Sequence, residues 1–225
     1  MLYNKDKLTD RQQNLPSNTG RLITFEGIDG SGKTTQIELL SARLAAEGIP
    51  VLLLREPGGT QIGEAIRGIL LDKAHTSMCI ETELLLFAAA RAQLVREVIV
   101  PELDAGKWVI CDRFYDSTIA YQGYGRQIDP TVIRSLNQLA VARCRPDITF
   151  LLDLPVDCAL TRLAGRNRLK DRLDNESVSF MQRTREGYCQ LAKDEPDRIV
   201  IMNATEPEEQ LAEHIYHTIR EGLAT

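Results

Sequence analysis

Short hydrophobic runs alternate with longer stretches of helical spacing along most of the chain. The first run, residues 22–25, precedes a glycine-rich turn and then residues 34–47, where Ile37, Leu40 and Leu44 recur at the period of a helix buried on one face. Four further runs have the length and composition of strands, at residues 51–54, 108–111, 148–153 and 199–202. Continuously apolar strands separated by helices indicate a parallel sheet. We therefore expect an α/β fold, a five-stranded parallel sheet with helices on both faces.

The N-terminal residues differ from the rest of the chain. Residues 1–19 are rich in Asn, Gln, Lys, Asp and Ser, show no sustained apolar period, and end in a Pro-Ser-Asn-Thr-Gly breaker. We expect them to form a flexible extension. Residues 20–225 contain no internal repeat or low-complexity linker, and folding ~200 residues buries about 70% of the surface of the unfolded chain. This part of the chain therefore predicts one domain.

The charge and cysteine content exclude several classes of protein. The formal net charge is -5, from 27 basic and 32 acidic residues, so the whole chain does not attract nucleic acid or anionic membrane. The longest uncharged apolar run, residues 84–90, is far shorter than the ~18 residues of a membrane span, and the N-terminus lacks a signal peptide's apolar core. Five scattered cysteines without a CxxC spacing indicate no disulfide framework or zinc site, and we expect them reduced and mostly buried. These features predict a cytoplasmic protein without a nucleic-acid or membrane partner.

The glycine-rich turn carries the strongest chemical signal. Residues 27–34 read Gly-Ile-Asp-Gly-Ser-Gly-Lys-Thr and match the P-loop pattern G-x-x-x-x-G-K-[ST] between a strand and a helix, as that motif requires. Its glycines let backbone N–H groups turn inward on a phosphate, Lys33 would reach the β and γ phosphates, and Thr34 would ligate Mg²⁺. The candidate ATP-binding residues are Gly27, Ile28, Asp29, Gly30, Ser31, Gly32, Lys33 and Thr34.

A second signal is the Asp112-Arg113 pair, which directly follows an apolar strand. The carboxyl ends of strands in open α/β folds are where ligands bind. Asp112 would hold Mg²⁺ through water there, and Arg113 would clamp a phosphate with two hydrogen bonds. An ordinary surface ion pair at a strand end explains the same two residues.

A third signal is an arginine on the apolar face of a helix. Projected as a helix, residues 82–99 place Arg91 on the face of Leu84, Phe87 and Val95. A guanidinium there must be paired or must face a ligand cavity, since burying an unpaired charge costs several kcal/mol or more. Phe87, one turn earlier, would point into the same space, so the two side chains could stack on and hydrogen-bond a base. A structural salt bridge for Arg91 and a core position for Phe87 fit the pattern equally well.

A basic run lies between residues 162 and 172 and contains little apolar content. Its basic residues are Arg162, Arg166, Arg168, Lys170 and Arg172. Such a run is usually solvated surface. In a phosphoryl-transfer enzyme it would instead be a short lid whose arginine approaches the transferring group, where an arginine contributes ~10³-fold or more.

Together these stretches resemble a known family. Residues 25–35, 55–60, 87–91, 112–114, 117–123 and 145–147 match, in order, the motifs of thymidylate kinases of the bacterial type. The resemblance covers about residues 21–222 and is much more specific than the P-loop alone. It implies a P-loop NTPase fold, transfer of the γ-phosphoryl group of ATP to dTMP with Mg²⁺ to give dTDP for dTTP synthesis, and a homodimer.

The resemblance also implies roles for individual residues. The acceptor-binding residues carried over are Asp29, Arg55, Phe87, Arg91, Arg113, Ser117, Thr118, Tyr121 and Gln122, and the candidate metal ligands are Thr34 and Asp112. In the family pattern Phe87 stacks on thymine, Arg91 donates to a base carbonyl, and Arg55 binds the acceptor phosphate. The candidate catalytic residues are Lys33, Arg113, Arg166, Arg168 and Arg172. The lid arginines are included because the variable P-loop positions 28–31 hold no arginine, as in the lid-arginine type of the family.

Two alternatives remain on this sequence. Another P-loop kinase would use a similar aromatic-plus-arginine base site, and those two side chains alone would not exclude uracil. A GTPase-like switch is disfavoured because no Asn-Lys-x-Asp motif follows the P-loop. The chain departs from the family at Phe114, where Tyr or His is common, so a polar side-chain contact is absent there.

Overall fold

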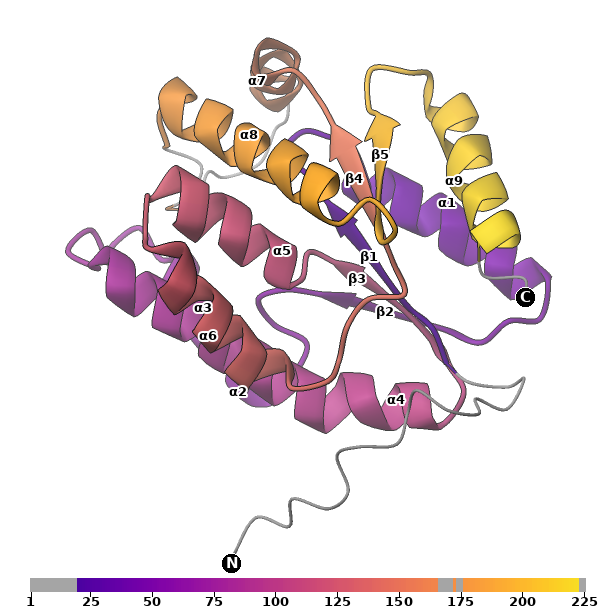
Figure 1. The fold of residues 1–225 in the computed structure, drawn as a ribbon, viewed down its shortest axis with the longest axis horizontal. Helices are drawn as coiled ribbons and strands as arrows, with labels where there is room; N and C mark the ends of the chain where they lie inside the picture. The colour runs from indigo at the N-terminus through magenta and orange to yellow at the C-terminus, as the bar shows by residue number, and fades with distance from the viewer. Residues whose placement is uncertain (1–19, 166–171, 173–175, 223–225) are drawn as a thin grey trace, which may run out of the picture.

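A computed structural model describes residues 20–165, 172 and 176–222. The expected extension, residues 1–19, lies outside the described residues. Five parallel strands form one sheet in the order β2-β3-β1-β4-β5 (Figure 1). The strands are β1 (Leu22–Glu26), β2 (Val51–Arg55), β3 (Trp108–Asp112), β4 (Ile148–Asp153) and β5 (Ile199–Asn203). Each expected strand is present to within one residue at either end, and the predicted parallel sheet is confirmed.

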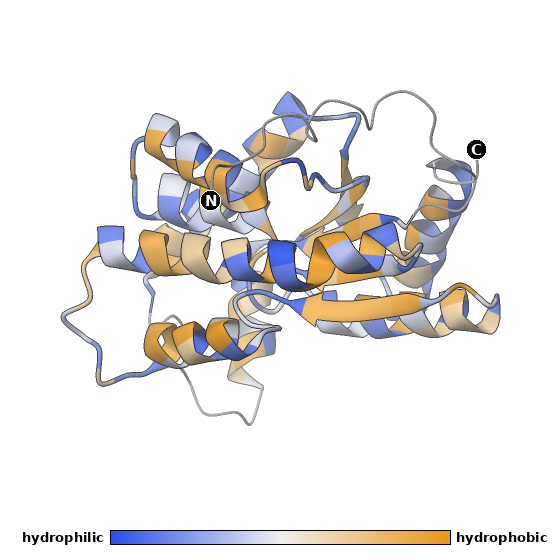
Figure 2. Cartoon of the chain, turned by 90° about the horizontal axis from the view of Figure 1, so that it is seen from below, coloured by the Kyte–Doolittle hydropathy of each residue, from blue (hydrophilic) through white to orange (hydrophobic). Residues whose placement is uncertain are grey.

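Helices cover both faces of this sheet, as predicted. One face carries α1 (Lys33–Ala46), α7 (Val156–Ala164) and α9 (Glu208–Gly222). The other carries α3 (Ile80–Leu94), α5 (Tyr115–Thr118), α6 (Pro130–Val141) and α8 (Val178–Asp194), with α2 (Gln61–Leu71) packed on α3. In Figure 2 the helices are striped in hydrophobic and hydrophilic residues, the pattern of helices that bury one face. Ile37, Leu40 and Leu44 of α1 are buried as their spacing predicts.

The sheet brings the chemical motifs to one edge. β1 is buried along its whole length between β3 and β4, and Phe25 pairs with Asp112 on one side and Phe150 on the other. Because the strands are parallel, the P-loop that follows β1 and the residues that follow β3 lie together at the carboxyl edge. The fold therefore places the two strongest sequence signals side by side.

The predicted helix over residues 82–99 is not a single α-helix. α3 ends at Leu94, a π-helical segment η2 follows at Val95–Ile99, and α4 (Val100–Asp104) completes the run. Pro101 has no N–H to continue the α-helical pattern, and the Val100 N–H donates to the carbonyl of Val95, five residues back. A second π-helical segment, η3 (Ile119–Gly125), continues α5.

Two further expectations concern the cysteines and membrane-spanning helices. All five cysteines are free thiols, but only Cys111 and Cys144 are buried, so the expectation that most would be buried was wrong. Cys158 and Cys189 lie on partly exposed helix faces, and Cys79 is exposed. Within the described ranges, the helices include none that is long and apolar enough to cross a membrane.

Candidate active site

A cavity of about 330 Å³ opens at the carboxyl edge of the sheet. All nine residues predicted to bind the acceptor line it, as do Lys33, Thr34 and Asp112. Of the other P-loop residues, Gly30 and Gly32 line the cavity, whereas Gly27, Ile28 and Ser31 do not. A larger groove of about 1020 Å³ between α6 and α8 contains none of the predicted residues. The predicted binding residues therefore lie around the smaller cavity.

The P-loop needs glycine at its two ends. Gly27 has φ +135°, and a Cβ there would lie 2.5 Å from the backbone oxygen of Leu152 in β4. Gly32 begins α1 with φ +92°, a conformation that favours glycine. The loop then bends over the Lys33 amine, whose Nζ donates to the carbonyl oxygens of Gly27 (3.0 Å) and Ile28 (3.1 Å). Burial, with Arg113 nearby, lowers the pKa of Lys33 to about 8.

Two oxygen-bearing side chains face each other beside the P-loop. The Thr34 hydroxyl at the start of α1 donates to Asp112 Oδ2 at the end of β3, at a distance of 3.5 Å. A hydroxyl and one carboxylate are the hard oxygen donors that Mg²⁺ takes from a protein when phosphates supply further ligands. The donor set at this point therefore fits the metal-binding prediction.

Arg113 is the most heavily bonded side chain of the cavity. Its NH1 donates to the Gly27 carbonyl (2.9 Å) and the Tyr188 hydroxyl (3.1 Å), and its NH2 donates to Asp29 Oδ1 (2.8 Å) and the Tyr121 hydroxyl (3.1 Å). Although burial lowers it, the pKa of Arg113 is raised well above its usual value by these tyrosines and Asp29. The surface-pair alternative for Arg113 is therefore not what the structure shows, because the side chain joins the loop after β3 to the P-loop.

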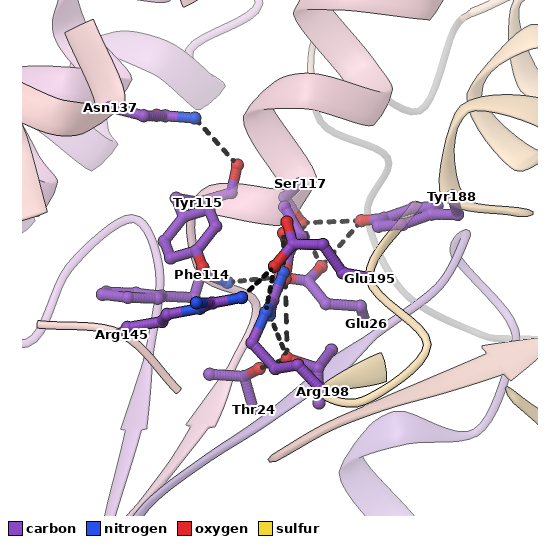
Figure 3. Close-up of polar contacts among 12 residues, drawn as sticks. Thr24, Glu26, Phe114, Tyr115, Ser117, Asn137, Arg145, Tyr188, Glu195 and Arg198 are labelled. Atoms are coloured by element: carbon purple, nitrogen blue, oxygen red, sulfur yellow. Dashed lines mark hydrogen bonds and ion pairs between the residues drawn. The ribbon is translucent and has the colours of Figure 1, made fainter. Parts of the chain in front are cut away.

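A buried glutamate stands behind Arg113, and the sequence analysis did not identify it. Glu26 Oε2 accepts hydrogen bonds from Ser117 (2.6 Å) and Tyr188 (2.8 Å), while Oε1 accepts the Phe114 N–H (2.7 Å) (Figure 3). Burial and the nearby Asp116 carboxylate raise the pKa of Glu26 to about 7. Phe114, where the chain departs from the family, contributes its backbone here while its ring lies in the core.

Arg91 is both paired and at the cavity. Its side chain is 1% exposed, and Nε donates to Glu56 Oε2 at 2.7 Å. NH1 donates to Thr118 Oγ1 (2.8 Å) and Asn137 Oδ1 (3.2 Å), and NH2 donates to the Phe114 carbonyl (3.3 Å). The structural salt bridge is thus present, yet the guanidinium also lines the cavity. Burial raises the pKa of Glu56 to about 7 although Arg91 lowers it.

The same wall of the cavity carries the predicted base-binding side chains. Phe87 is half-buried and lines the cavity one turn before Arg91, so it is not a core residue. Gln122 of η3 also lines the cavity and donates from Nε2 to Glu83 Oε1 at 3.0 Å. An aromatic ring, a guanidinium and an amide therefore face one space, the groups that a pyrimidine base requires.

Two further arginines line the cavity. Arg55 ends β2 and donates to the Pro57 carbonyl (3.1 Å) and to Glu64 of α2 (3.0 Å). Arg67 of α2 donates to the same Pro57 carbonyl (2.9 Å) and also lines the cavity, although the sequence analysis did not select it. Its position three residues after Glu64 on a helix gave no signal, because only the fold turns α2 toward the cavity.

The basic run divides into parts with different surroundings. Arg162 belongs to α7 and donates to the carbonyl oxygens of Gly30 (3.3 Å) and Ala204 (2.8 Å), so the run begins within a helix. Arg172 donates to the Leu70 carbonyl (2.7 Å) and to Glu83 (2.6 Å) and does not line the cavity. The other two predicted catalytic arginines, Arg166 and Arg168, lie outside the described residues.

Comparison with known proteins gives a consistent result. A family model described as Thymidylate kinase matches residues 25–215. A thymidylate kinase of Desulfovibrio desulfuricans is 49% identical over 195 residues, which cover 84% of this chain and 90% of that protein. Thymidylate kinases of Syntrophotalea carbinolica and Trichlorobacter lovleyi are 47% and 49% identical, covering 89% and 90% of this chain and 95% and 98% of those proteins.

Proposed function

The chain belongs to the thymidylate kinase family, whose members phosphorylate dTMP to dTDP with ATP, and from this premise we propose how its residues divide the reaction. The observation that carries the proposal is the single cavity in which the P-loop lysine, Arg113 and the Phe87-Arg91 wall meet. The P-loop binds the ATP phosphates, and the opposite wall binds dTMP. Both substrates are phosphorylated nucleotides, so we also place the reaction in the cytoplasm.

At the donor end, the backbone N–H groups of the P-loop and Lys33 hold the β and γ phosphates. Thr34 and Asp112 would hold Mg²⁺, which when bound would neutralise charge on those phosphates. The Lys33 amine already lies under the loop, 3.0 Å from the Gly27 carbonyl, so it needs only a local rotation to donate to a phosphate oxygen.

At the acceptor end, Phe87 stacks on the thymine, and Arg91 and Gln122 donate to its polar edge. Ser117, Thr118 and Tyr121 line the nucleoside side of the cavity, and Asp29 lies beside Arg113, near the sugar. Arg113 and Arg55, which both line the cavity at the ends of neighbouring strands, bind the acceptor phosphate. A guanidinium suits this work because its planar donors match the oxygens of a phosphate.

The chemistry requires little acid or base catalysis. The attacking group is a phosphate oxygen that is already anionic, so positioning and charge neutralisation should supply most of the rate. Lys33 and Arg113 supply positive charge from the protein core, and an arginine among Arg166, Arg168 and Arg172 supplies it from the lid. The variable P-loop positions include Gly30 and Ser31 and hold no arginine, which supports the assignment of a catalytic arginine to the lid.

The replacement of Lys33 by alanine tests this division most simply. We expect kcat to fall by ~10²-fold or more while dTMP still binds, since the lysine acts on charge that redistributes during transfer. Lys107→Ala is the matched control, because Lys107 is partly exposed, pairs with Glu102 and does not line the cavity. Near-normal turnover of Lys33→Ala would remove the P-loop from the proposed mechanism.

We further propose a homodimer formed through α2, α3 and α6. These neighbouring helices carry apolar side chains that remain exposed: Ile62, Ile69, Leu85, Val132 and Leu139. Leu139 is 71% exposed, and a group of exposed apolar side chains on neighbouring helices marks a protein–protein contact site. Light scattering on the wild type and on Leu139→Asp should give a dimer and a monomer, and a monomeric wild type would exclude the proposal.

A further inference from the structure

Glu26 is a buried ionisable group that the proposed mechanism does not yet use. It ends β1, immediately before the P-loop, and its side chain is 0% exposed. It does not line the cavity. Its hydrogen bonds run to the loop after β3, to α5 and to α8, the elements that surround Arg113 (Figure 3).

The two hydroxyls bonded to Glu26 are also partners of Arg113. Arg113 NH1 donates to Tyr188 at 3.1 Å and to Ser117 at 3.3 Å. A hydroxyl has one proton and two lone pairs. The two hydroxyl oxygens also lie 2.7 Å apart, so one hydroxyl donates to the other and the second donates to Glu26. Whichever hydroxyl donates to Glu26, lone pairs of both oxygens are left to face the guanidinium. Glu26 thus sets the direction of the hydrogen bonds that hold Arg113.

We propose that Glu26 is a positioning residue for phosphoryl transfer, which fixes Arg113 toward the acceptor phosphate through the hydroxyls of Ser117 and Tyr188. The proposal rests on the assignment of Arg113 to the acceptor end. Arg113 has φ +70°, an unfavourable backbone conformation for a residue other than glycine. The hydrogen bonds of its side chain therefore help to hold the residue in this conformation.

The neighbouring charges are arranged so that Glu26 serves Arg113. The nearest other carboxylate, Asp116, is paired through both oxygens with Arg198, at 2.7 and 2.9 Å. Arg198 in turn donates to Glu195 at 2.9 Å, which closes a separate network behind the first (Figure 3). Asp116 therefore has its own cation, and Glu26 is the carboxylate that orients the two hydroxyls.

The Glu26→Gln variant tests the direction of these hydrogen bonds with almost no change in side-chain size. Glu26 Oε1 accepts the Phe114 N–H, so the amide oxygen of Glu26→Gln must occupy that position. The amide NH₂ group then points at the two hydroxyls and donates to them. One hydroxyl proton then lies in the 2.7 Å bond between Ser117 and Tyr188, and the other loses its acceptor and turns toward Arg113, which opposes the guanidinium charge. The substitution therefore reverses the hydrogen-bond polarity around Arg113.

The test is the steady-state kinetics of Glu26→Gln, measured with dTMP and ATP varied separately at about pH 8, where the Glu26 carboxyl is mostly ionised. We expect KM for dTMP to rise roughly tenfold, which corresponds to about 1.4 kcal/mol, with KM for ATP changed less than about twofold. Tyr188→Phe should raise KM for dTMP by less, because it removes one acceptor without reversing it. Glu38→Gln, on the exposed face of α1, should match the wild type.

A double-mutant cycle with Arg113→Ala separates this proposal from the mechanism on which it rests. If Glu26 acts through Arg113, then Glu26→Gln has no further effect on KM for dTMP in the Arg113→Ala background. Equal changes in both KM values, or an undiminished effect in that background, would overturn the positioning role. If Arg113→Ala itself leaves KM for dTMP unchanged, the assignment of Arg113 fails instead. Should Glu26→Gln fail to fold, Tyr188→Phe carries the same cycle.

Discussion

The arginines of the cavity and those of the basic run are held in different ways. Arg91 and Arg113 belong to the acceptor wall, the side of the cavity that we assign to dTMP and that also carries Phe87 and Gln122. Side chains from several elements bond these two arginines, and their exposed fractions are 1% and 17%. In the basic run, Arg162 is exposed and donates to two backbone carbonyls, and Arg172 joins a carbonyl of α2 to Glu83. The acceptor wall is therefore shaped by packed side chains, whereas the described part of the basic run combines one surface arginine, Arg162, with one that is packed against the buried Glu83, Arg172.

The difference matches the two tasks of the reaction. A base is recognised by groups whose directions are fixed, since an unpaired buried donor or acceptor costs about 1–3 kcal/mol. Charge neutralisation at a transferring phosphoryl group needs a cation that arrives with the substrates and excludes water. We therefore expect mutations in the acceptor wall to change binding and stability, and mutations in the basic run to change kcat.

The largest expected effect comes from replacing Arg91 in the acceptor wall. Arg91→Ala leaves the Glu56 carboxylate buried without its cation, which typically costs 3–5 kcal/mol of unfolding free energy. Urea unfolding should show that loss, and KM for dTMP should rise in any folded fraction. Arg134→Ala, at an exposed position on α6, should change stability by less than about 0.5 kcal/mol. An unchanged midpoint for Arg91→Ala would mean that the pair does not stabilise the wall.

The second prediction concerns the other side of the comparison. Single alanine replacements of Arg166, Arg168 and Arg172 should include at least one that lowers kcat by ~10²-fold with little change in either nucleotide's dissociation constant. Arg172→Ala should also lower Tm, because Arg172 pairs with the buried Glu83. Near-wild-type kcat in all three variants would make the run a solvated surface and the lid-arginine assignment wrong.

The third prediction concerns the base-binding part of the acceptor wall. Phe87→Ala should raise KM for dTMP by the loss of one stacking contact, about 1–3 kcal/mol, and leave KM for ATP unchanged. Glu81→Ala is the control on the same helix, since Glu81 is exposed and outside the cavity. If Phe87→Ala raises both KM values equally, the ring supports the fold and does not bind the base.

The smallest expected effect is on the pH dependence of stability. Burial raises the pKa of Glu26 from 4.5 to about 7, so between these values the native state binds a proton that the unfolded chain has released. That contribution to stability is full below about 4.5 and is lost as the pH rises through about 7. Tm should therefore fall over this window in the wild type and fall less in Glu26→Gln. Parallel curves for the two proteins would contradict the pKa shift.

Much of the fold followed from local patterns. The strands and the α1 stripe needed only apolar continuity and helical spacing, which burial on both faces of a parallel sheet imposes on the sequence. The π-helical segment at Val95–Ile99 could not be derived, because a single projection angle assumes one helix type throughout. Pro101 was the local signal that the regular pattern would end.

The candidate site was predictable where a residue has an unusual place in its own pattern. Arg91 lies on an apolar helix face, where a guanidinium needs a partner. The sequence could not show that the partner is the Glu56 carboxylate from a distant loop. Arg67 and Tyr188 gave no such signal, since a helical arginine and a buried tyrosine are ordinary residues. Their roles arise from tertiary contacts between elements far apart in the chain.

The most direct test of the account is a pair of crystal structures, one of the protein alone and one with dTMP and a non-hydrolysable ATP analogue. We predict that the guanidinium groups of Arg91 and Arg113 keep their hydrogen bonds to Glu56 and Tyr188 in both, shifting by less than about 1 Å. Residues 162–172 should change position and bring an arginine to the phosphates only in the complex. Acceptor-wall arginines that exchange partners on binding, beside an unchanged basic run, would contradict the division of labour proposed for the two regions.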